Sequence, residues 1–371
     1  MPKEKQIVEN LLHNSGITIN GDSLADIKVK NDNFYKRVLS QGSLGLGESY
    51  VDGWWEAEKL DEFFYHLLRH ELDKKVKTKF LFFHIFKAII FNLGSKSKAF
   101  KIGEYHYDVS NKLYEKMLGR RMVYSSGYWK EADNLDQAQA DKLDLVCKKL
   151  YLKPGMKILD IGCGWGSFCK YAASKYGVKV VGTTVSREQV ELGKKLCAGL
   201  DVEIKLQDYR DISGKYDRIV SLGMFEHVGY KNYRQFMEIA EKSLKDDGLF
   251  LLHTIGGNKS VKTIDPWIAR YIFPNSMLPS IRQIAESIEN LFVMEDWHNF
   301  SVDYYKTLMA WFANFKKIWP ELEGGKYDKK FYRTWKYYLL SSAGGFRSRK
   351  NQLWQIVLSK RGVLGGYKSI R

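Results

Sequence analysis

The sequence lacks an apolar run long enough to cross a lipid bilayer. Its most hydrophobic stretch, residues 80–91, is too short to span and carries His84 and Lys87. We expect this stretch to be either a helix buried in the protein or in a dimer interface, or a helix lying in a membrane surface. Residues 1–14 also lack the apolar core of a secretory signal, so we expect a cytoplasmic protein.

Cysteines and metal-ligand clusters are scarce too. The 371 residues include four cysteines, no two of them spaced as C-x-x-C: Cys147, Cys163, Cys169 and Cys197. This pattern predicts reduced thiols in a packed domain, and neither a disulfide framework nor a zinc site. His66 and His70 stand one helical turn apart, but no third ligand accompanies them. A solvated helix face is therefore favoured over a metal site, and we predict no metal.

Acidic residues are too few to balance the basic ones. There are 59 Lys and Arg against 43 Asp and Glu, which gives a formal net charge of +16. An excess of this size indicates an anionic partner, either nucleic acid or an anionic membrane surface, and composition alone does not choose between them. Aromatic residues make up 14% of the chain, which favours a surface that faces lipid.

The most informative motif covers residues 157–167, where an apolar run ends in Asp160 and glycines follow at positions 162, 164 and 166. It is neither the G-x-G-x-x-G of dinucleotide folds nor the G-K-[ST] of triphosphate sites. Bare backbone can approach a ligand here, at the start of a predicted helix. A second expected strand, residues 178–184, gives the βαβ order of a doubly wound sheet. We favour a site for S-adenosylmethionine over a plain tight turn.

From this motif onward, strands and helices alternate as a parallel sheet requires. The expected strands are 157–161, 179–183, 202–207, 216–222 and 249–254. The helices between them are expected at 167–176, 186–197 and 232–244. Beyond residue 265 the alternation stops, and the remaining elements are a strand at 291–297, aromatic-rich helices at 304–319 and 331–340, and a strand at 353–358.

These elements predict an α/β fold, a doubly wound, Rossmann-like methyltransferase sheet. We place the two aromatic-rich helices as a cover over its carboxyl edge, where open α/β sheets bind ligands. The expected domains are a mostly helical, membrane-associated front domain (1–92), a small, polar and basic linker (93–104) and a catalytic domain (105–371).

Four polar residues fall where loops leave the expected strands or where the cover begins. Glu226 follows the fourth strand, and His253 ends the fifth. Tyr304 opens the first cover helix, and Ser126 lies in an aromatic loop at 124–129. Each alone is better explained by a structural role, such as a core histidine or a helix cap. Together, at one edge of one sheet, they predict a polar cluster inside an aromatic pocket.

With these features in place, the chain closely resembles the cyclopropane-fatty-acyl-phospholipid synthases over nearly its whole length. The matching blocks, in the family's order, are 105–108, 159–166, 207–211, 223–229, 251–256, 265–267, 271–275, 294–300 and 352–355. The resemblance implies an enzyme that transfers the methyl carbon of S-adenosylmethionine across a cis double bond of a phospholipid acyl chain, giving a cyclopropane ring.

The same resemblance implies two sets of site residues. S-adenosylmethionine is expected to contact Tyr124, Ser125, Asp160, Gly162, Cys163, Gly164, Gly166, Thr184, Gln189, Asp208, Tyr209 and Arg210. Gln189 is the family's substitute for the acid that many nucleotide folds place at the second strand's end. A bicarbonate ion is expected to be held by Ser126, Glu226, His253, the Ile255 backbone and Tyr304. The four side chains of that set are the predicted catalytic residues.

The reaction explains why such a site is needed. An isolated alkene is a weak nucleophile, so the sulfonium must be held in line with the double bond. Methylation leaves a carbocation that must lose a proton from the new methyl group before it meets water. Aromatic side chains exclude water and offer ring faces to a cation. A small bound base such as bicarbonate then takes the proton, and we predict that Glu226 and His253 organise this base and do not abstract the proton themselves.

The chain departs from the family pattern at two serines. Many relatives carry cysteine at the position of Ser126, and others carry it at the position of Ser342. A serine at 126 can still donate a hydrogen bond to the anion. A serine at 342 argues against an obligatory cysteine nucleophile.

Other functions stay open at this point. The nearest is a lipid methyltransferase of the same fold that reduces the cation to a methyl branch. An RNA methyltransferase would also explain the charge, but no RNA-binding module is visible, so we predict no nucleic-acid partner. A catalytically inactive lipid-binding protein is the third. We expect an enzyme bound peripherally to the inner face of the membrane, favouring anionic lipid and forming a homodimer.

Overall fold

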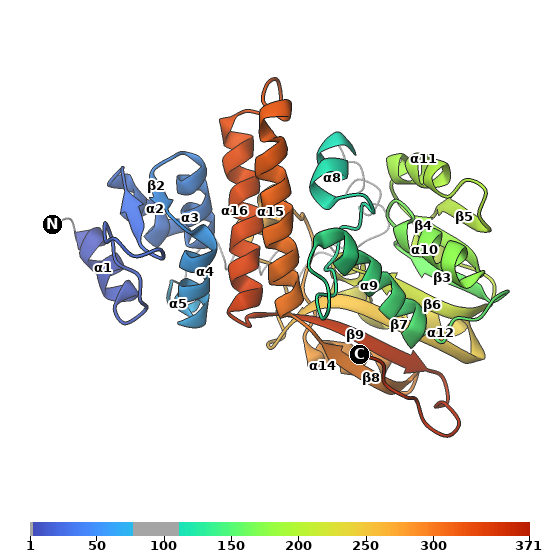
Figure 1. Ribbon diagram of the computed structural model, residues 1–371. Helices are drawn as coiled ribbons and strands as arrows, with labels where there is room; N and C mark the ends of the chain where they lie inside the picture. Colours follow the sequence, from blue (N-terminus) through green and yellow to red (C-terminus); the bar gives the residue numbers. More distant parts are fainter. Residues whose placement is uncertain (1–2, 77–110) are drawn as a thin grey trace. The chain divides into compact units, whose positions relative to one another are not determined.

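The computed structural model describes residues 3–76 and 111–371, which fall into two compact units (Figure 1). The first unit comprises Met1–Phe91, Lys262–Asn275 and Tyr304–Asn351. The second comprises Asn92–Val261, Ser276–Asp303 and Gln352–Arg371. These limits differ from the sequential domains expected above, because two later segments pack with the front of the chain. The expected linker (93–104), the apolar stretch 80–91 and the block 105–108 lie outside the described residues.

The second unit is built on a seven-stranded sheet in the order β5-β4-β3-β6-β7-β9-β8. Its strands are β3 (Lys157–Ile161), β4 (Lys179–Thr184), β5 (Val202–Leu206), β6 (Tyr216–Leu222), β7 (Leu244–Gly257), β8 (Val293–Asn299) and β9 (Asn351–Ser359). Strands β3 to β7 pair in parallel, and β8 is antiparallel to β9. The chain order reverses between β3 and β6, and ligands of open α/β sheets bind at the carboxyl ends of such strands.

Helices cover both faces of this sheet. They are α8 (Asn111–Leu118), α9 (Leu135–Lys149), α10 (Ser167–Tyr176), α11 (Arg187–Leu196), α12 (Tyr233–Ser243) and α14 (Ile281–Ile288), with 3-10 turns η1 (Tyr209–Asp211), η2 (Phe225–His227) and η3 (Tyr230–Asn232). Alternate strand residues face opposite sides, so Leu159 and Ile161 join one buried cluster and Ile158 joins the other. Two covered faces explain why β3, β4 and β9 are buried along nearly their whole length.

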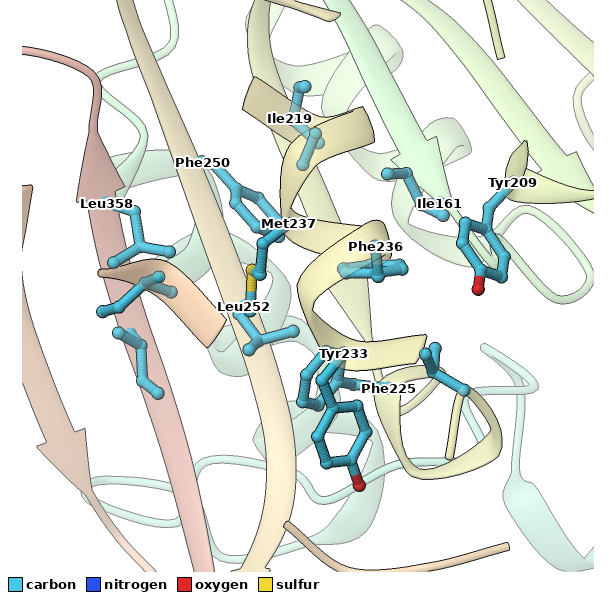
Figure 2. Packing of buried hydrophobic residues seen from close by; sticks show 14 of the residues in the cluster. Ile161, Tyr209, Ile219, Phe225, Tyr233, Phe236, Met237, Phe250, Leu252 and Leu358 are labelled. Atoms are coloured by element: carbon cyan, nitrogen blue, oxygen red, sulfur yellow. The ribbon is translucent and has the colours of Figure 1, made fainter. Parts of the chain in front are cut away.

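Figure 2 shows the first of these clusters, where α12 and η2 pack on the sheet. The Phe225 and Tyr233 rings stack with their centroids 4.2 Å apart, and Phe236 meets Phe225 edge-on at 5.2 Å. Phe250 and Leu252 of β7 complete this side of the cluster. Helices α9, α10 and α11 supply the helical residues of the other cluster. The packing of η2 fixes the loop that carries Glu226.

The first unit is mostly helical. It contains α1 (Lys3–Leu12), α2 (Asn33–Gln41), α3 (Ser43–Val51), α4 (Leu60–Arg69), α5 (Leu72–Lys75), α13 (Pro266–Tyr271), nearly all of α15 (Val302–Leu322) and α16 (Lys329–Arg347). A small antiparallel pair, β1 (Ile27–Val29) and β2 (Trp55–Ala57), joins them. Helices α15 and α16 lie side by side (Figure 1).

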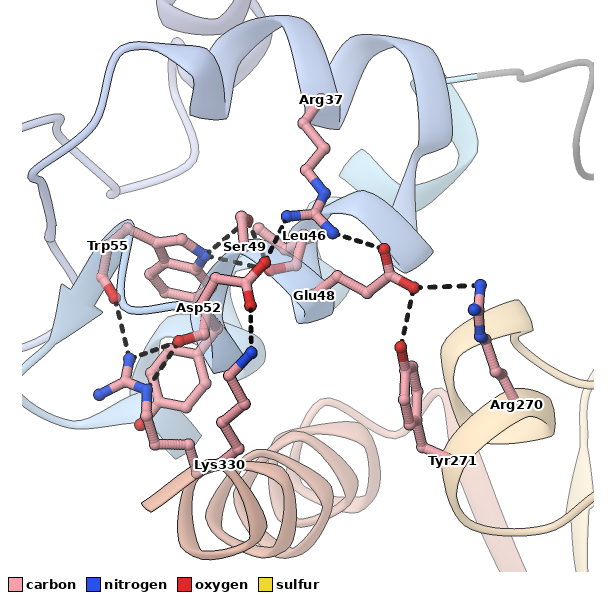
Figure 3. A network of polar contacts seen from close by, with 11 residues as sticks. Arg37, Leu46, Glu48, Ser49, Asp52, Trp55, Arg270, Tyr271 and Lys330 are labelled. Atoms are coloured by element: carbon pink, nitrogen blue, oxygen red, sulfur yellow. Dashed lines mark hydrogen bonds and ion pairs between the residues drawn. The ribbon is translucent and has the colours of Figure 1, made fainter. Parts of the chain in front are cut away.

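A polar network holds the separate segments of the first unit together (Figure 3). Arg37 of α2 donates to Glu48 at 2.6 Å and to Asp52 at 2.7 Å. Glu48 also accepts from the Tyr271 hydroxyl at 2.9 Å and pairs with Arg270 at 3.2 Å, both from α13. These bonds explain why residues 262–275 pack with the front of the chain.

Three features of the described residues bear on earlier expectations. His66 Nδ1 lies 3.0 Å from the Ser15 carbonyl oxygen, and within residues 3–76 and 111–371 no group of three His, Cys, Asp or Glu is placed to hold a metal ion. All four cysteines are free and buried, as expected. Across the same described residues, no helix has the length and apolar character needed to cross a membrane.

Gly344→Ala should weaken the packing of α16 on α4. A Cβ at Gly344 would lie 2.5 Å from the Phe64 Cβ and 2.9 Å from the Asp61 carbonyl oxygen, so helices must separate. At Gly345 the nearest atom, 2.9 Å away, belongs to the flexible Asn351 side chain. Alanine gains helix propensity equally at both positions. We therefore expect Gly344→Ala to unfold roughly 1–3 kcal/mol more easily than Gly345→Ala in urea. Equal stabilities would contradict this packing.

Candidate active site

The loops after β3 and β6 meet at the point where the strand order reverses. A Cβ at Gly162, whose φ is +83°, would lie 2.5 Å from the Met224 Cγ. A valine side chain at position 162 would therefore collide with Met224 before it reached a bound ligand. A Cβ at Gly166 would crowd Ile204 and Cys197, and Cys163 packs beneath Gly182. These positions serve packing.

Gly164 differs from its neighbours. Its φ is +57°, and a Cβ placed there would meet no atom within 4 Å. Backbone at this position borders open space at the carboxyl edge of the sheet, which is the cradle that a nucleotide-type ligand requires. Of the three motif glycines, Gly164 is the one whose surroundings fit a bound S-adenosylmethionine.

The ends of β4 and β5 bring further predicted cofactor residues to this edge. The Thr184 hydroxyl donates to Gln189 Oε1 at 2.6 Å, and both residues are buried. Asp208 accepts from the Arg210 N–H at 2.9 Å and from its guanidinium at 3.0 Å. The Arg210 guanidinium lies over the Tyr209 ring, 4.5 Å from its centroid. The structure thus places these residues after the carboxyl ends of neighbouring strands, at one edge of the sheet.

Asp160 and Lys142 form a buried pair of titratable groups beneath the glycine loop. Burial raises the pKa of Asp160 to about 7 and lowers the pKa of Lys142 to about 7, and their mutual attraction opposes both shifts. The Cys169 thiol lies 3.4 Å from Asp160 Oδ2, while Oδ1 has no hydrogen-bond partner among the described residues. An open carboxyl oxygen in this place suits a ligand that donates a hydrogen bond.

Helix α9 supplies two site residues that sequence reasoning missed. Lys142 Nζ lies 3.1 Å from Ser125 Oγ, and Gln139 Nε2 donates to the Ser125 carbonyl at 2.8 Å. Both side chains are fully buried, so they hold the 124–126 loop from below. Their spacing of three residues places them on one helix face. Polar residues on the same helix as the core residues Leu143 and Val146 were the available signal.

Glu226 lies in η2, just after β6, and His253 lies in β7, where it pairs with Leu222 at the end of β6; β7 continues to Gly257, so His253 does not end the strand as expected. Glu226 Oε1 accepts from the Ile255 N–H at 2.6 Å, and the Gly223 N–H donates to the His253 carbonyl at 2.9 Å. Glu226 Oε2 and His253 Nε2 are buried, and within residues 3–76 and 111–371 neither has a hydrogen-bond partner. Each of these two open atoms is able to form one further hydrogen bond.

Burial sets the protonation of this pair. Burial raises the pKa of Glu226 to about 7, against the opposing bond from Ile255. Burial, with the positive charges of Lys142 and Lys149 and the nearby His298, holds the pKa of His253 well below its usual range. The imidazole is therefore neutral and carries one N–H, while Glu226 titrates near neutrality.

The other predicted anion ligands are placed as follows. The Ile255 N–H is engaged by Glu226, so a bound anion would have to share it. The buried Ser126 hydroxyl donates to the Gly127 carbonyl at 2.9 Å. Tyr304 belongs to the first unit, where its ring stacks on Phe346 with centroids 4.5 Å apart. Of the predicted anion ligands, Glu226 and Ile255 are thus joined by a hydrogen bond, and His253 lies two residues before Ile255 in β7.

Comparisons with known proteins identify the family. Residues 94–356 match the family model described as mycolic acid cyclopropane synthetase. The chain belongs to this family. The cyclopropane-fatty-acyl-phospholipid synthase of Escherichia coli (strain K12) is 54% identical over 367 residues, which cover 99% of this chain and 96% of that one. A probable fatty acid methyltransferase of Pseudomonas putida is 38% identical, over 69% of this chain and 68% of its own.

Solved structures agree. The cyclopropane synthase MmaA2 from Mycobacterium tuberculosis has a TM-score of 0.65 at 31% identity, covering 70% of this chain and 98% of its own. Mycolic acid cyclopropane synthase CmaA1, complexed with SAH and CTAB, has a TM-score of 0.64 at 32% identity with the same coverage. The predicted family, the α/β methyltransferase fold and the enzyme class, an S-adenosylmethionine-dependent methyltransferase, are confirmed.

Gly164→Ala should fold but lose affinity for S-adenosylmethionine. The added methyl group enters the open space at the sheet edge, where the ligand would lie. Gly155, with φ of +81° and nothing within 4 Å of an added Cβ, is the matched control, since alanine there carries similar backbone strain away from the site. We expect at least a roughly tenfold weaker affinity by titration calorimetry for Gly164→Ala alone. Equal binding by both variants would show that the ligand lies elsewhere.

Glu226→Gln should stabilise the protein at high pH. A carboxyl whose pKa rises from 4.5 to about 7 on folding destabilises the fold increasingly as pH rises through this window, and the cost is complete above it. The gain should therefore be roughly 2 kcal/mol larger at about pH 8.5 than at about pH 5, measured by urea unfolding. Glu238→Gln, an exposed carboxylate on α12, is the control. A gain that does not depend on pH would contradict the burial argument.

Proposed function

We propose that this chain converts a cis double bond of a phospholipid acyl chain into a cyclopropane ring. The observation that carries the proposal is the buried pair Glu226 and His253, each with an open polar atom, at the edge where the cofactor loop lies. The 54% identity to a cyclopropane-fatty-acyl-phospholipid synthase supports the same activity. The nearest alternative, a methyl-branching enzyme, has support from the 38% identical probable fatty acid methyltransferase.

The residues at the sheet edge fit S-adenosylmethionine, which supplies an electrophilic methyl carbon when bound. Gly164 would let the cofactor approach the backbone closely, and the open Asp160 oxygen would accept a hydrogen bond from the cofactor. Gln189, fixed by Thr184, would recognise the ribose. The expected roles of Tyr124, Asp208, Tyr209 and Arg210 belong to the same proposal.

After methyl transfer, the lipid carries a cation that must lose a proton from the new methyl group to close the ring. The surroundings of His253 are aromatic: the Phe300 ring lies 5.8 Å from it, and Tyr128 meets Phe300 edge-on at 5.5 Å. Such a lining excludes water, which would otherwise capture the cation. Bicarbonate, when bound, supplies the base. His253 would donate to it and Glu226 would accept its hydroxyl, with Ser126, Ile255 and Tyr304 as further proposed ligands.

Ring formation in lipids of cells expressing the chain, followed by mass spectrometry, tests the activity. We expect a gain of one CH2 unit as a ring; a methyl branch would add two further hydrogens and favour the alternative. With purified protein in degassed buffer, activity should rise with added bicarbonate. Glu226→Gln should need roughly ten- to hundred-fold more, because one charge-assisted hydrogen bond is lost. Wild-type activity that ignores bicarbonate, with a variant inactive throughout, would make Glu226 the base.

We also propose peripheral binding to an anionic membrane surface as a homodimer. The net charge of +16 supports this attraction. Co-sedimentation with vesicles containing anionic lipid should exceed that with neutral vesicles at low salt and should fall as salt approaches about 1 M, where screening is strong. Equal binding to both vesicles would remove the electrostatic attraction. A monomer by light scattering at assay concentration would contradict the dimer.

A further inference from the structure

Gln355 is a buried polar residue in an otherwise apolar stretch of strand. It lies in the middle of β9, between β7 and β8 in the sheet, and its neighbours Leu353, Trp354, Ile356, Val357 and Leu358 are all buried. Its own side chain is fully buried as well. Burying an amide costs free energy unless its hydrogen bonds are made. Because the Gln355 amide is buried at this cost, we expect it to serve a function.

The amide of Gln355 faces the histidine of the proposed anion site. Gln355 Nε2 lies 3.4 Å from His253 Nδ1, while Gln355 Oε1 has no partner among the described residues. The amide nitrogen can only donate. If Nδ1 accepts this bond it is bare, and because the imidazole is neutral its single proton is then on Nε2. That nitrogen is the open atom identified above.

We propose that Gln355 is a positioning residue that fixes His253 in the tautomer with its proton on Nε2. His253 then presents a hydrogen-bond donor to the proposed anion. The Ile255 N–H positions Glu226 in a similar way: it donates to Oε1 and leaves Oε2 open. The reversed amide, with Oε1 accepting from Nδ1–H, would leave Nε2 as a bare acceptor and repel an anion. The inference rests on the proposed bicarbonate function for its benefit, but its tautomer can be measured without it.

The first test uses the wild-type protein labelled with nitrogen-15 at histidine, free of lipid and cofactor. Nitrogen spectra separate bare and protonated ring nitrogens, and His253→Gln identifies the signal by its loss. We expect the proton on Nε2. A proton on Nδ1 would overturn the proposal.

The second test compares Gln355→Met with Gln352→Met. Both remove a buried amide from β9, but Gln352 bonds to Asn299 and Ser301, away from His253. Gln355→Met should give a mixture of tautomers and raise the bicarbonate concentration for half-maximal activity roughly three- to tenfold. Gln352→Met should change neither reading.

Gln355→Glu provides a variant in the opposite direction. A buried carboxyl ionises only at raised pH. Once ionised, it accepts a hydrogen bond from Nδ1, so at alkaline pH it should draw the proton to Nδ1 and weaken anion binding further than methionine does. Unchanged tautomer and bicarbonate response in both Gln355 variants would refute the proposal. If instead the tautomer shifts while wild-type activity ignores bicarbonate, Gln355 positions His253 as proposed and the bicarbonate function is what fails. If the Gln355 variants do not fold, the wild-type spectrum alone decides the tautomer.

Discussion

The proposed active site depends on a few polar atoms that are buried at the carboxyl edge of the sheet without hydrogen-bond partners. Asp160 Oδ1, Glu226 Oε2 and His253 Nε2 have no hydrogen-bond partner among the described residues. Each such atom costs about 1–3 kcal/mol. Three such atoms therefore cost a large fraction of the usual net stability of a protein, which is about 5–15 kcal/mol. The apolar clusters on both faces of the sheet offset this free-energy cost. Their packing also holds the strand ends in place, so that these polar atoms do not move into contact with other polar groups.

The motif at residues 157–167 shows how far a sequence pattern carries. The bounds of β3, β6 and α10 were predicted to the residue, because apolar runs and a glycine start mark them. The pattern could not separate its glycines by role, because that depends on contacts with distant segments. Gly162 packs against Met224, and Gly166 packs against Ile204 and Cys197. Only the packed structure shows that Gly164 faces open space.

Other misses have local or long-range causes. Helices α13 and α14 were not expected, although Asp265 before Pro266 and the Ser280–Gln283 capping box are readable start signals. The return of 262–275 to the front of the chain was not readable, because it depends on Glu48 meeting Arg270 and Tyr271. Gln355 fell in a block already matched to the family, yet its contact with His253 depends on the order β7-β9 in the sheet.

The charges around His253 connect its two properties, neutrality and attraction for an anion. Lys142 and Lys149 lower its pKa, and burial holds the pKa of each of these lysines to about 7. Lys149 is itself held by His298 Nδ1 at 2.9 Å and by Asp296 at 3.8 Å. An anion bound at His253 would favour the charged form of both lysines, and the charged lysines would in turn favour the anion. Because an imidazolium would add desolvation and repulsion, the same field that attracts an anion keeps His253 a neutral donor. Its hydrogen bond, and not its charge, would then contribute to holding the proposed anion.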